Sequence, residues 1–215
     1  MVIKIDNRED WLKTRSVKGI SGSGAGSVLG VNKYRSNVEL WEIKTGKRKA
    51  PDISDKPAIQ FGKFAKPLLR ELFKQNYPDF TVDYDEFDMY VNDEYPFIFA
   101  TLDGQLTAPD GSRGILKIKT TTIQNRVQWD EWDGKIPDSY YVQVLHQLTT
   151  TGWDFAILCA YIRYHVDGEV RVTIRHYRIN RKDVESDIDF LIKEETKFWE
   201  QVQKNQLPAL KLPEI

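Results

Sequence analysis

Cysteine and histidine are scarce in this 215-residue chain, which contains one cysteine and three histidines. The lone Cys159 cannot form an internal disulfide, and its apolar context, AILCAYI, predicts a buried thiol in a reducing environment. The histidines, His146, His165 and His176, are too scattered to complete a zinc site with that cysteine. Disulfide scaffolds and Cys/His zinc modules are therefore excluded.

Long hydrophobic runs and an excess of one charge are also missing. No apolar run approaches the roughly 18 residues of a membrane helix, and the first ten residues, MVIKIDNRED, lack a signal-peptide core. We therefore expect a cytoplasmic protein without a membrane partner. The net charge of -1 does not indicate a nucleic-acid partner, although basic groups confined to one groove remain compatible with one. The length and the 40% hydrophobic content predict one globular domain over residues 1–215.

Apolar periodicity predicts helices first and strands later. The expected helices cover residues 6–18, 23–30, 36–46, 58–76, 122–130, 137–151 and 181–204. The expected strands cover residues 80–84, 87–92, 97–102, 104–108, 113–119, 154–164 and 170–178, the last two joined at Asp167-Gly168. Residues 20–26 are predicted to be a small-residue loop, and Pro67 to kink or divide its helix. This order predicts an α/β fold with a central mixed sheet flanked by helices.

The residues best suited to chemistry lie in the segment 97–122, FIFATLDGQLTAPDGSRGILKIKTTT. A hydrophobic strand delivers Asp103 to a turn at Gly104. In ILKIKT, strand alternation places Lys117 and Lys119 on one face and the intervening apolar residues on the other. We therefore expect Asp103 and the side chains at 117 and 119 to converge at adjacent strand ends.

This layout is that of the restriction-endonuclease-like nucleases, which carry Asp, a gap and then Asp/Glu-x-Lys. Phosphodiester hydrolysis there uses Mg²⁺ held by carboxylates and a backbone carbonyl, with Mn²⁺ as a substitute. The lysine orients or deprotonates water and stabilises developing negative charge. Taken alone the pattern is weak, because an exposed strand with two lysines is the simpler explanation.

Four motifs together resemble the lambda exonuclease and YqaJ-type viral recombinase family over nearly the full chain. They are Arg15 with GISGSGAGSVLGVNKYRS and ELWEIKTG, then FGKFAKPLLRELF, then TLDG with ILKIKT, and finally IPDSYYVQVLHQLTTTG. The resemblance implies a restriction-endonuclease-like core. It also implies metal ligation by Asp103 and the Ile118 carbonyl, a catalytic Lys119, a helix glutamine at Gln143, and 5′-phosphate binding by Arg15 and Ser23. Tyr140 and Gln147, one helical turn from Gln143, are further candidates for DNA contact.

Structural roles remain open for several of these residues. Arg15 can be an ordinary surface cation, and Ser23 can be a helix N-cap. Gln143 and Gln147 can form a buried polar pair. Two tryptophans, Trp129 and Trp132, are predicted to be core residues in preference to stacking on an unpaired base.

The sequence departs from the family at two acidic positions. Lys66 and Lys117 stand where the resemblance calls for glutamate. With Asp103 and three lysines the site has a formal charge of +2, whereas two glutamates would make it -2. Because like charges repel strongly at short range, we expect poor Mg²⁺ binding and slow or absent cleavage. An engineered inactive variant and a natural pseudonuclease are both open origins.

The resemblance implies Mg²⁺-dependent 5′→3′ exonuclease action on linear double-stranded DNA, leaving 3′ single strands for an annealing partner. It further implies a ring-shaped homotrimer and a phage or prophage protein in a bacterial host. Two alternatives are a non-catalytic DNA-end-binding or regulatory module and an endonuclease of the same fold.

Overall fold

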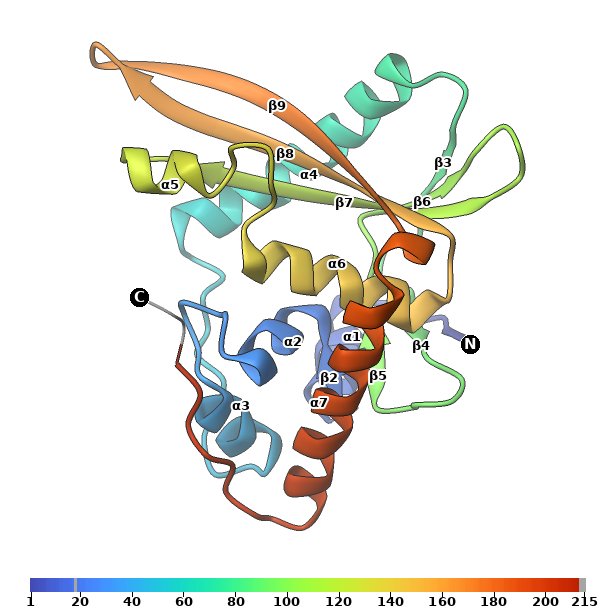
Figure 1. The fold of residues 1–215 in the computed structure, drawn as a ribbon, viewed down its shortest axis with the longest axis vertical. Helices are drawn as coiled ribbons and strands as arrows, with labels where there is room; N and C mark the ends of the chain where they lie inside the picture. The colour runs from blue at the N-terminus through green and yellow to red at the C-terminus, as the bar shows by residue number, and fades with distance from the viewer. Residues whose placement is uncertain (18, 213–215) are drawn as a thin grey trace.

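A computed structural model describes residues 1–17 and 19–212 and contains two mixed β-sheets flanked by helices. In chain order the elements are β1 (Val2–Ile3), α1 (Arg8–Val17), β2 (Ile20–Ser21), α2 (Gly22–Leu29), α3 (Asn37–Lys44), α4 (Pro57–Asn76), β3 (Thr81–Asp83), β4 (Met89–Val91), β5 (Ile98–Ala100), β6 (Gly104–Thr107), β7 (Arg113–Thr122), α5 (Arg126–Asp130), α6 (Asp138–Thr151), β8 (Phe155–Val166), β9 (Glu169–Asn180), the 3-10 turn η1 (Arg181–Asp183) and α7 (Glu185–Gln203). The expected end of the first helix at residue 18 lies outside the described residues. The expected α/β architecture is present (Figure 1).

The larger sheet carries the candidate chemistry. Its five strands run in the order β3-β6-β7-β8-β9, with β7 and β8 parallel and the other neighbours antiparallel. Four short strands form a second sheet in the order β1-β4-β5-β2. The larger sheet is the expected central mixed sheet, and the second sheet forms because β4 and β5 pair with the N-terminal segments β1 and β2 instead of joining β6.

Helices cover both faces of the larger sheet around β7. Leu116 and Ile118 pack against the inner side of α4, whereas Ile115 belongs to the cluster that includes α6 residues. In Figure 1, α4 lies behind the sheet, and α6 crosses beneath it. Cys159 on β8 is buried in the α4 cluster, so the predicted core role of this thiol is confirmed.

Local signals explain several element ends. Ser36 accepts a hydrogen bond from the Glu39 amide while the Glu39 carboxylate accepts from the Ser36 amide, which forms a complete capping box at the start of α3. Gly152 ends α6 with a left-handed φ of 71°. Asp167 and Gly168 both have positive φ, at 51° and 80°, and form the predicted turn between β8 and β9.

Two local predictions were wrong. The segment 20–26 is not a loop: β2 ends at Ser21 and α2 begins at Gly22, so Ser21 holds the N-cap position and Ser23 lies inside the helix. Small residues let α2 start this early against α6, since a Cβ at Gly22 would lie only 3.2 Å from Gln143 Cγ. Of the two outcomes expected at Pro67, a kink or a division, the division is wrong, because α4 runs continuously through it.

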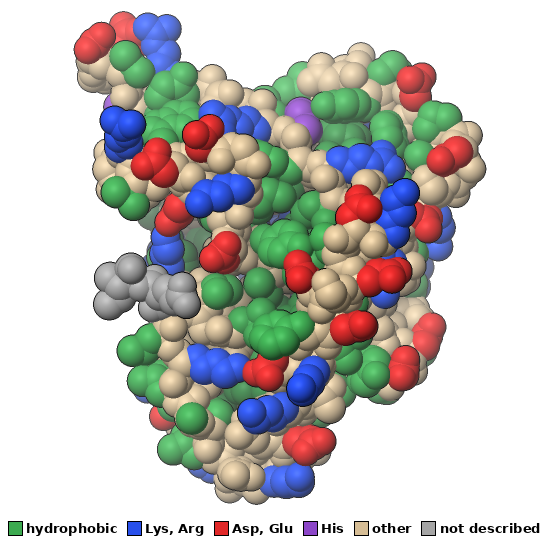
Figure 2. Space-filling view, in the orientation of Figure 1, with side chains coloured by type: hydrophobic (Ala, Val, Ile, Leu, Met, Phe, Trp, Pro, Cys, Tyr) green, Lys and Arg blue, Asp and Glu red, His purple; other side chains and the backbone are tan. Residues whose placement is uncertain are grey.

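The distribution of charge on the surface does not indicate a function by itself. On the face in Figure 2, the described acidic and basic side chains are interspersed. Among the described residues, no helix combines the length and apolarity needed to cross a membrane.

The two tryptophans predicted to be core residues are buried or packed in the core. Trp132 is 2% exposed, and Trp129 packs against the core cluster that contains Trp132.

Candidate functional site

Asp103 stands at the start of β6, directly opposite the centre of β7. Gly104 pairs with Leu116 in the antiparallel β6–β7 ladder, so the preceding residue, Asp103, comes level with Lys117. Arg70 on α4 holds this point from behind, because its Nε donates to the Asp103 carbonyl oxygen at 2.8 Å. The guanidinium of Arg70 also stacks on Tyr84, 3.5 Å from the ring centroid. The sheet and α4 together fix the carboxylate.

Both oxygens of the Asp103 carboxylate are engaged by lysines. Lys66 Nζ lies 2.7 Å from Oδ1, and Lys117 Nζ lies 2.9 Å from Oδ2. The Ile118 amide also donates to Oδ2 at 3.0 Å. The Lys117 and Asp103 side chains are 8% and 9% exposed, whereas that of Lys66 is 40% exposed. The structure therefore brings α4, β6 and β7 together through one carboxylate and two ammonium groups.

Burial and the neighbouring charges shift the pKa values of Asp103 and Lys117. Burial alone would raise the pKa of Asp103, but attraction by Lys117 and Lys66 and the hydrogen bonds from Lys66 and Ile118 outweigh it, so the pKa falls below its ordinary value. Burial lowers the pKa of Lys117, and attraction by Asp103 offsets part of that effect. Asp103 is thus held as a carboxylate, with its negative charge already compensated.

Lys119 completes the cluster from the next position on the same face of β7. Its ammonium lies 4.8 Å from the centroid of the Tyr140 ring on α6. Burial, followed by repulsion from Lys117, lowers the pKa of Lys119 to about 7. The charge of Asp103 acts on it in the opposite direction. The predicted convergence of Asp103 with Lys117 and Lys119 is therefore present in the fold.

This centre does not fit a magnesium ion. Mg²⁺ selects several hard oxygen ligands, mainly carboxylates. Here the one carboxylate has both oxygens bound to ammonium groups. Within residues 1–17 and 19–212, no three His, Cys, Asp or Glu side chains gather in a metal-binding group. The contact that Ile118 makes with Asp103 comes from its amide, not from the carbonyl expected to ligate a metal.

A second cluster of cations lies at the N-terminus of α2. Arg15 from α1 donates through Nη2 to Ser23 Oγ at 3.2 Å, and Ser21 Oγ lies 3.3 Å from the same oxygen. The first turn of α2 contains no acidic residue. Free amide groups and the helix dipole make such a terminus favourable for an anion. The structure therefore joins Arg15 and Ser23, the two residues expected to bind phosphate.

Sequence reasoning missed two members of this cluster. Arg35 donates to the Ser23 carbonyl oxygen at 3.1 Å and to Ser27 Oγ at 3.2 Å. Lys44 donates to the Arg15 carbonyl oxygen at 3.4 Å. Burial, then repulsion by Arg15 and Arg35, lowers the pKa of Lys44 to about 8. Both residues fall inside the quoted N-terminal motifs, which was the available signal.

Helix α6 lies between the two clusters. Gln143 packs against Gly22 at the start of α2, and Tyr140 faces Lys119. Gln147 is only 2% exposed, and its amide donates to the Thr101 carbonyl oxygen at 2.9 Å. Because it is enclosed, Gln147 supports the strand end before Asp103, and the predicted direct contact with DNA does not fit its position.

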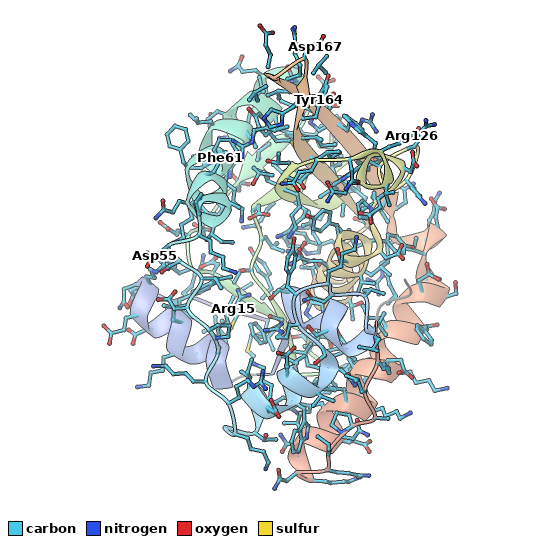
Figure 3. All side chains as sticks on the ribbon, turned by 90° about the vertical axis from the view of Figure 1, so that its left-hand side faces the viewer. Arg15, Asp55, Phe61, Arg126, Tyr164 and Asp167 are labelled. Atoms are coloured by element: carbon cyan, nitrogen blue, oxygen red, sulfur yellow. The ribbon has the colours of Figure 1, made fainter. Side chains whose placement is uncertain are left out.

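The two clusters are linked through one helix, because Gln143 of α6 contacts Gly22 and Tyr140 of α6 contacts Lys119. The charge of Arg15 contributes to lowering the pKa of Lys117, so the guanidinium lies within electrostatic range of the lysine centre. In Figure 3, Arg15 lies near the middle, with Phe61 of α4 and Arg126 of α5 above it. The N-terminus of α2 and Lys119 of the central strand β7 are thus both in contact with α6.

Comparison with known proteins identifies the family. Residues 10–154 match the model of the YqaJ-like viral recombinase domain. The chain belongs to this family. It is 33% identical over 208 residues to the uncharacterized protein YqaJ of Bacillus subtilis (strain 168), a match covering 95% of this chain. The YqaJ-family chain spans 59% of the length of that relative.

Solved structures share the fold of this YqaJ-family chain. An alkaline exonuclease from Laribacter hongkongensis (LHK-Exo) has a TM-score of 0.66 at 20% identity, with 92% of this chain and 94% of that chain covered. Its complex with dAMP has a TM-score of 0.67 at the same identity and coverage. A phage-related exonuclease from Haemophilus somnus 129PT has a TM-score of 0.54 at 12% identity, covering 90% and 99% of the two chains. The expected restriction-endonuclease-like core is thereby confirmed.

Proposed function

We propose that this chain binds the ends of linear double-stranded DNA as a member of the phage recombination exonuclease class, and that its own hydrolytic activity is weak or absent. Family membership and the fold shared with exonucleases support the class. The observation that carries the second part is the pairing of both Asp103 oxygens with Lys66 and Lys117. The centre offers donors to a phosphate but little to a divalent cation.

The cations around the N-terminus of α2 (Arg15, Arg35 and Lys44, with Ser23), called the α2 cluster, are proposed to receive the 5′ phosphate of the DNA end. Guanidinium groups and hydroxyls suit phosphate oxygens, and Arg15, Arg35 and Ser23 supply both around a helix N-terminus. Burial first, and repulsion by Arg15 and Arg35 second, lower the pKa of Lys44, so part of the cost of keeping these three cations together is mutual repulsion. A dianionic phosphate relieves that repulsion. Gln143, which contacts the start of α2, and Tyr140, which contacts Lys119, connect this cluster to the lysine centre.

The polarity and the downstream partner follow from the same proposal. Anchoring a 5′ phosphate favours 5′→3′ action that leaves a 3′ single strand for an annealing protein. A ring-shaped homotrimer around the duplex would make that action processive. Size-exclusion chromatography with light scattering tests this assembly: a trimer mass agrees with it, and a monomer mass at all concentrations contradicts it.

DNA binding and digestion test the core of the proposal. Fluorescence anisotropy should show tighter binding of a 5′-phosphorylated blunt duplex than of its 5′-hydroxyl counterpart, and little binding of a closed circle. Incubation with Mg²⁺ should leave linear DNA largely intact. Rapid digestion of linear DNA would refute the impaired activity, and cleavage of the circle would favour an endonuclease. Equal binding of all three DNAs would refute end recognition.

A further inference from the structure

The lysine centre consists of Lys66, Lys117, Lys119 and Asp103, and its three ammonium groups outnumber its one carboxylate. Lys66, Lys117 and Lys119 surround the single carboxylate of Asp103. Lys117 is buried and directed at that carboxylate, so its charge is compensated inside the protein. The uncompensated charge therefore belongs to the outer pair, Lys66 and Lys119.

These two ammonium groups also retain unused hydrogen-bond donors. An ammonium has three N–H donors, and Lys66 directs one to Asp103 Oδ1 while its side chain stays 40% exposed. The contact of Lys119 is with the face of Tyr140, and no carboxylate of residues 1–17 and 19–212 pairs with Lys119. A half-buried ammonium without a counter-ion is costly unless an anion binds beside it.

The position of the lysine centre favours a DNA phosphate as that anion. The centre is connected to the α2 cluster by α6, since Tyr140 contacts Lys119 and Gln143, on the same helix, contacts Gly22 at the start of α2. Successive phosphates of one DNA strand are spaced about 3.4 Å along the helix axis. A strand whose terminal phosphate occupies the α2 cluster and that follows α6 would bring one of its next phosphates to the lysine centre.

We propose that Lys66 and Lys119 hold a backbone phosphodiester of the DNA strand directly, in place of metal ions. Asp103 and Lys117 act as the internal ion pair that positions Lys66. This inference rests on the proposed function, because it assumes that a DNA end enters the α2 cluster. It differs from a metal-dependent site in one measurable respect: binding needs no divalent cation, and Mg²⁺ weakens it by competing for the phosphate.

A duplex with one neutral linkage tests this contact. The probe is a 5′-phosphorylated blunt duplex with a methylphosphonate at the first internucleotide linkage, compared with the unmodified duplex in EDTA. For the full chain we expect the neutral linkage to weaken binding about tenfold. Lys66→Gln and Lys119→Gln should each weaken binding of the unmodified duplex by a similar factor and lower its sensitivity to the neutral linkage. Lys63→Gln, an exposed lysine on the same helix, is the matched control and should change neither.

The outcomes separate the two proposals. If the 5′ phosphate still governs affinity but the neutral linkage and both lysine substitutions have no effect, the phosphate site is wrong and end binding stands. Loss of binding in EDTA with recovery in Mg²⁺ also overturns it. If the full chain ignores the 5′ phosphate altogether, both proposals fail. Circular dichroism of each variant shows whether a loss of affinity reflects unfolding, and the methylphosphonate arm needs no variant.

Discussion

Lys66 and Lys117 bind opposite oxygens of the Asp103 carboxylate, at 2.7 Å and 2.9 Å. One lysine comes from α4 and the other from β7, so a single carboxylate joins a helix to the sheet. Where the family resemblance calls for clustered carboxylates, this chain has an ion-pair bridge. The same bridge gives Asp103 a structural role.

Loss of Asp103 should destabilise the fold. Asp103→Ala leaves Lys117, whose side chain is 8% exposed, without its partner. Removing one member of a buried pair typically costs about 3 kcal/mol or more. Urea denaturation should show a decrease of that order in the free energy of unfolding. Asp110→Ala, in an exposed turn, is the control and should change it by less than about 1 kcal/mol. A similarly small change for Asp103→Ala would contradict the bridge.

Binding of the 5′ phosphate should depend on pH through Lys44. Its pKa is lowered to about 8, so Lys44 loses its charge as pH rises through that value. The preference for a 5′-phosphorylated over a 5′-hydroxyl duplex should therefore fall between about pH 7 and 9. Lys44→Arg keeps the charge and should flatten this profile. An unchanged slope in Lys44→Arg would exclude Lys44 as its source.

Arg15 should set the size of the phosphate preference itself. Arg15→Gln removes the guanidinium that binds Ser23 Oγ and lies in the α2 cluster. We expect at least about tenfold weaker binding of the phosphorylated duplex and little change for the hydroxyl form. Arg171→Gln, on the exposed hairpin strand β9, is the matched control. Equal losses for both DNAs would point to general electrostatics instead of a pocket.

A buried histidine should make stability pH-dependent. His146 Nδ1 lies 2.7 Å from Glu195 Oε1 on α7, and Nε2 lies 2.9 Å from the Phe99 carbonyl oxygen on β5, so both nitrogens face acceptors. Burial lowers its pKa and Arg15 adds to that effect, but attraction and hydrogen bonding by Glu195 with the Phe99 carbonyl raise it overall. A raised pKa gives stability that is complete below the unfolded value and lost as pH rises through the folded value.

Thermal melts measure this contribution. The melting temperature should fall as pH rises above neutrality, and His146→Phe should remove that slope. His165→Phe, at the exposed end of β8, should retain it. If His165→Phe and His146→Phe behave alike, the pair does not control the titration.

Much of the lysine centre was predictable from local pattern. Strand alternation placed Lys117 and Lys119 on one face, and an antiparallel turn brought Asp103 beside them. Lys66 required the family resemblance, because no local rule tells which strand a helix residue will meet. That its ammonium would pair with Asp103, and not stand apart from it, depends on the packing of α4.

The sequence predicted only part of the α2 cluster. The motif predicted Arg15 and Ser23. Arg35, just before α3, and Lys44, at the end of α3, donate to the carbonyl oxygens of Ser23 and Arg15. Gln147 was misassigned because helical spacing shows which residues share a face but not how deeply that face is covered. Ser23 was taken as a possible N-cap because glycine-rich segments normally favour loops, and here the close approach of Gln143 instead requires small residues in a helix.

Metal binding by the glutamate revertant tests the central claim most directly. Isothermal titration calorimetry with Mg²⁺ and Mn²⁺ compares the chain with Lys66→Glu/Lys117→Glu, and Lys56→Glu/Lys63→Glu serves as the control with the same change in charge. We predict that only Lys66→Glu/Lys117→Glu shows saturable metal binding, a metal-dependent rise in melting temperature and digestion of linear DNA. Equal metal binding and digestion by the unaltered chain would contradict the account.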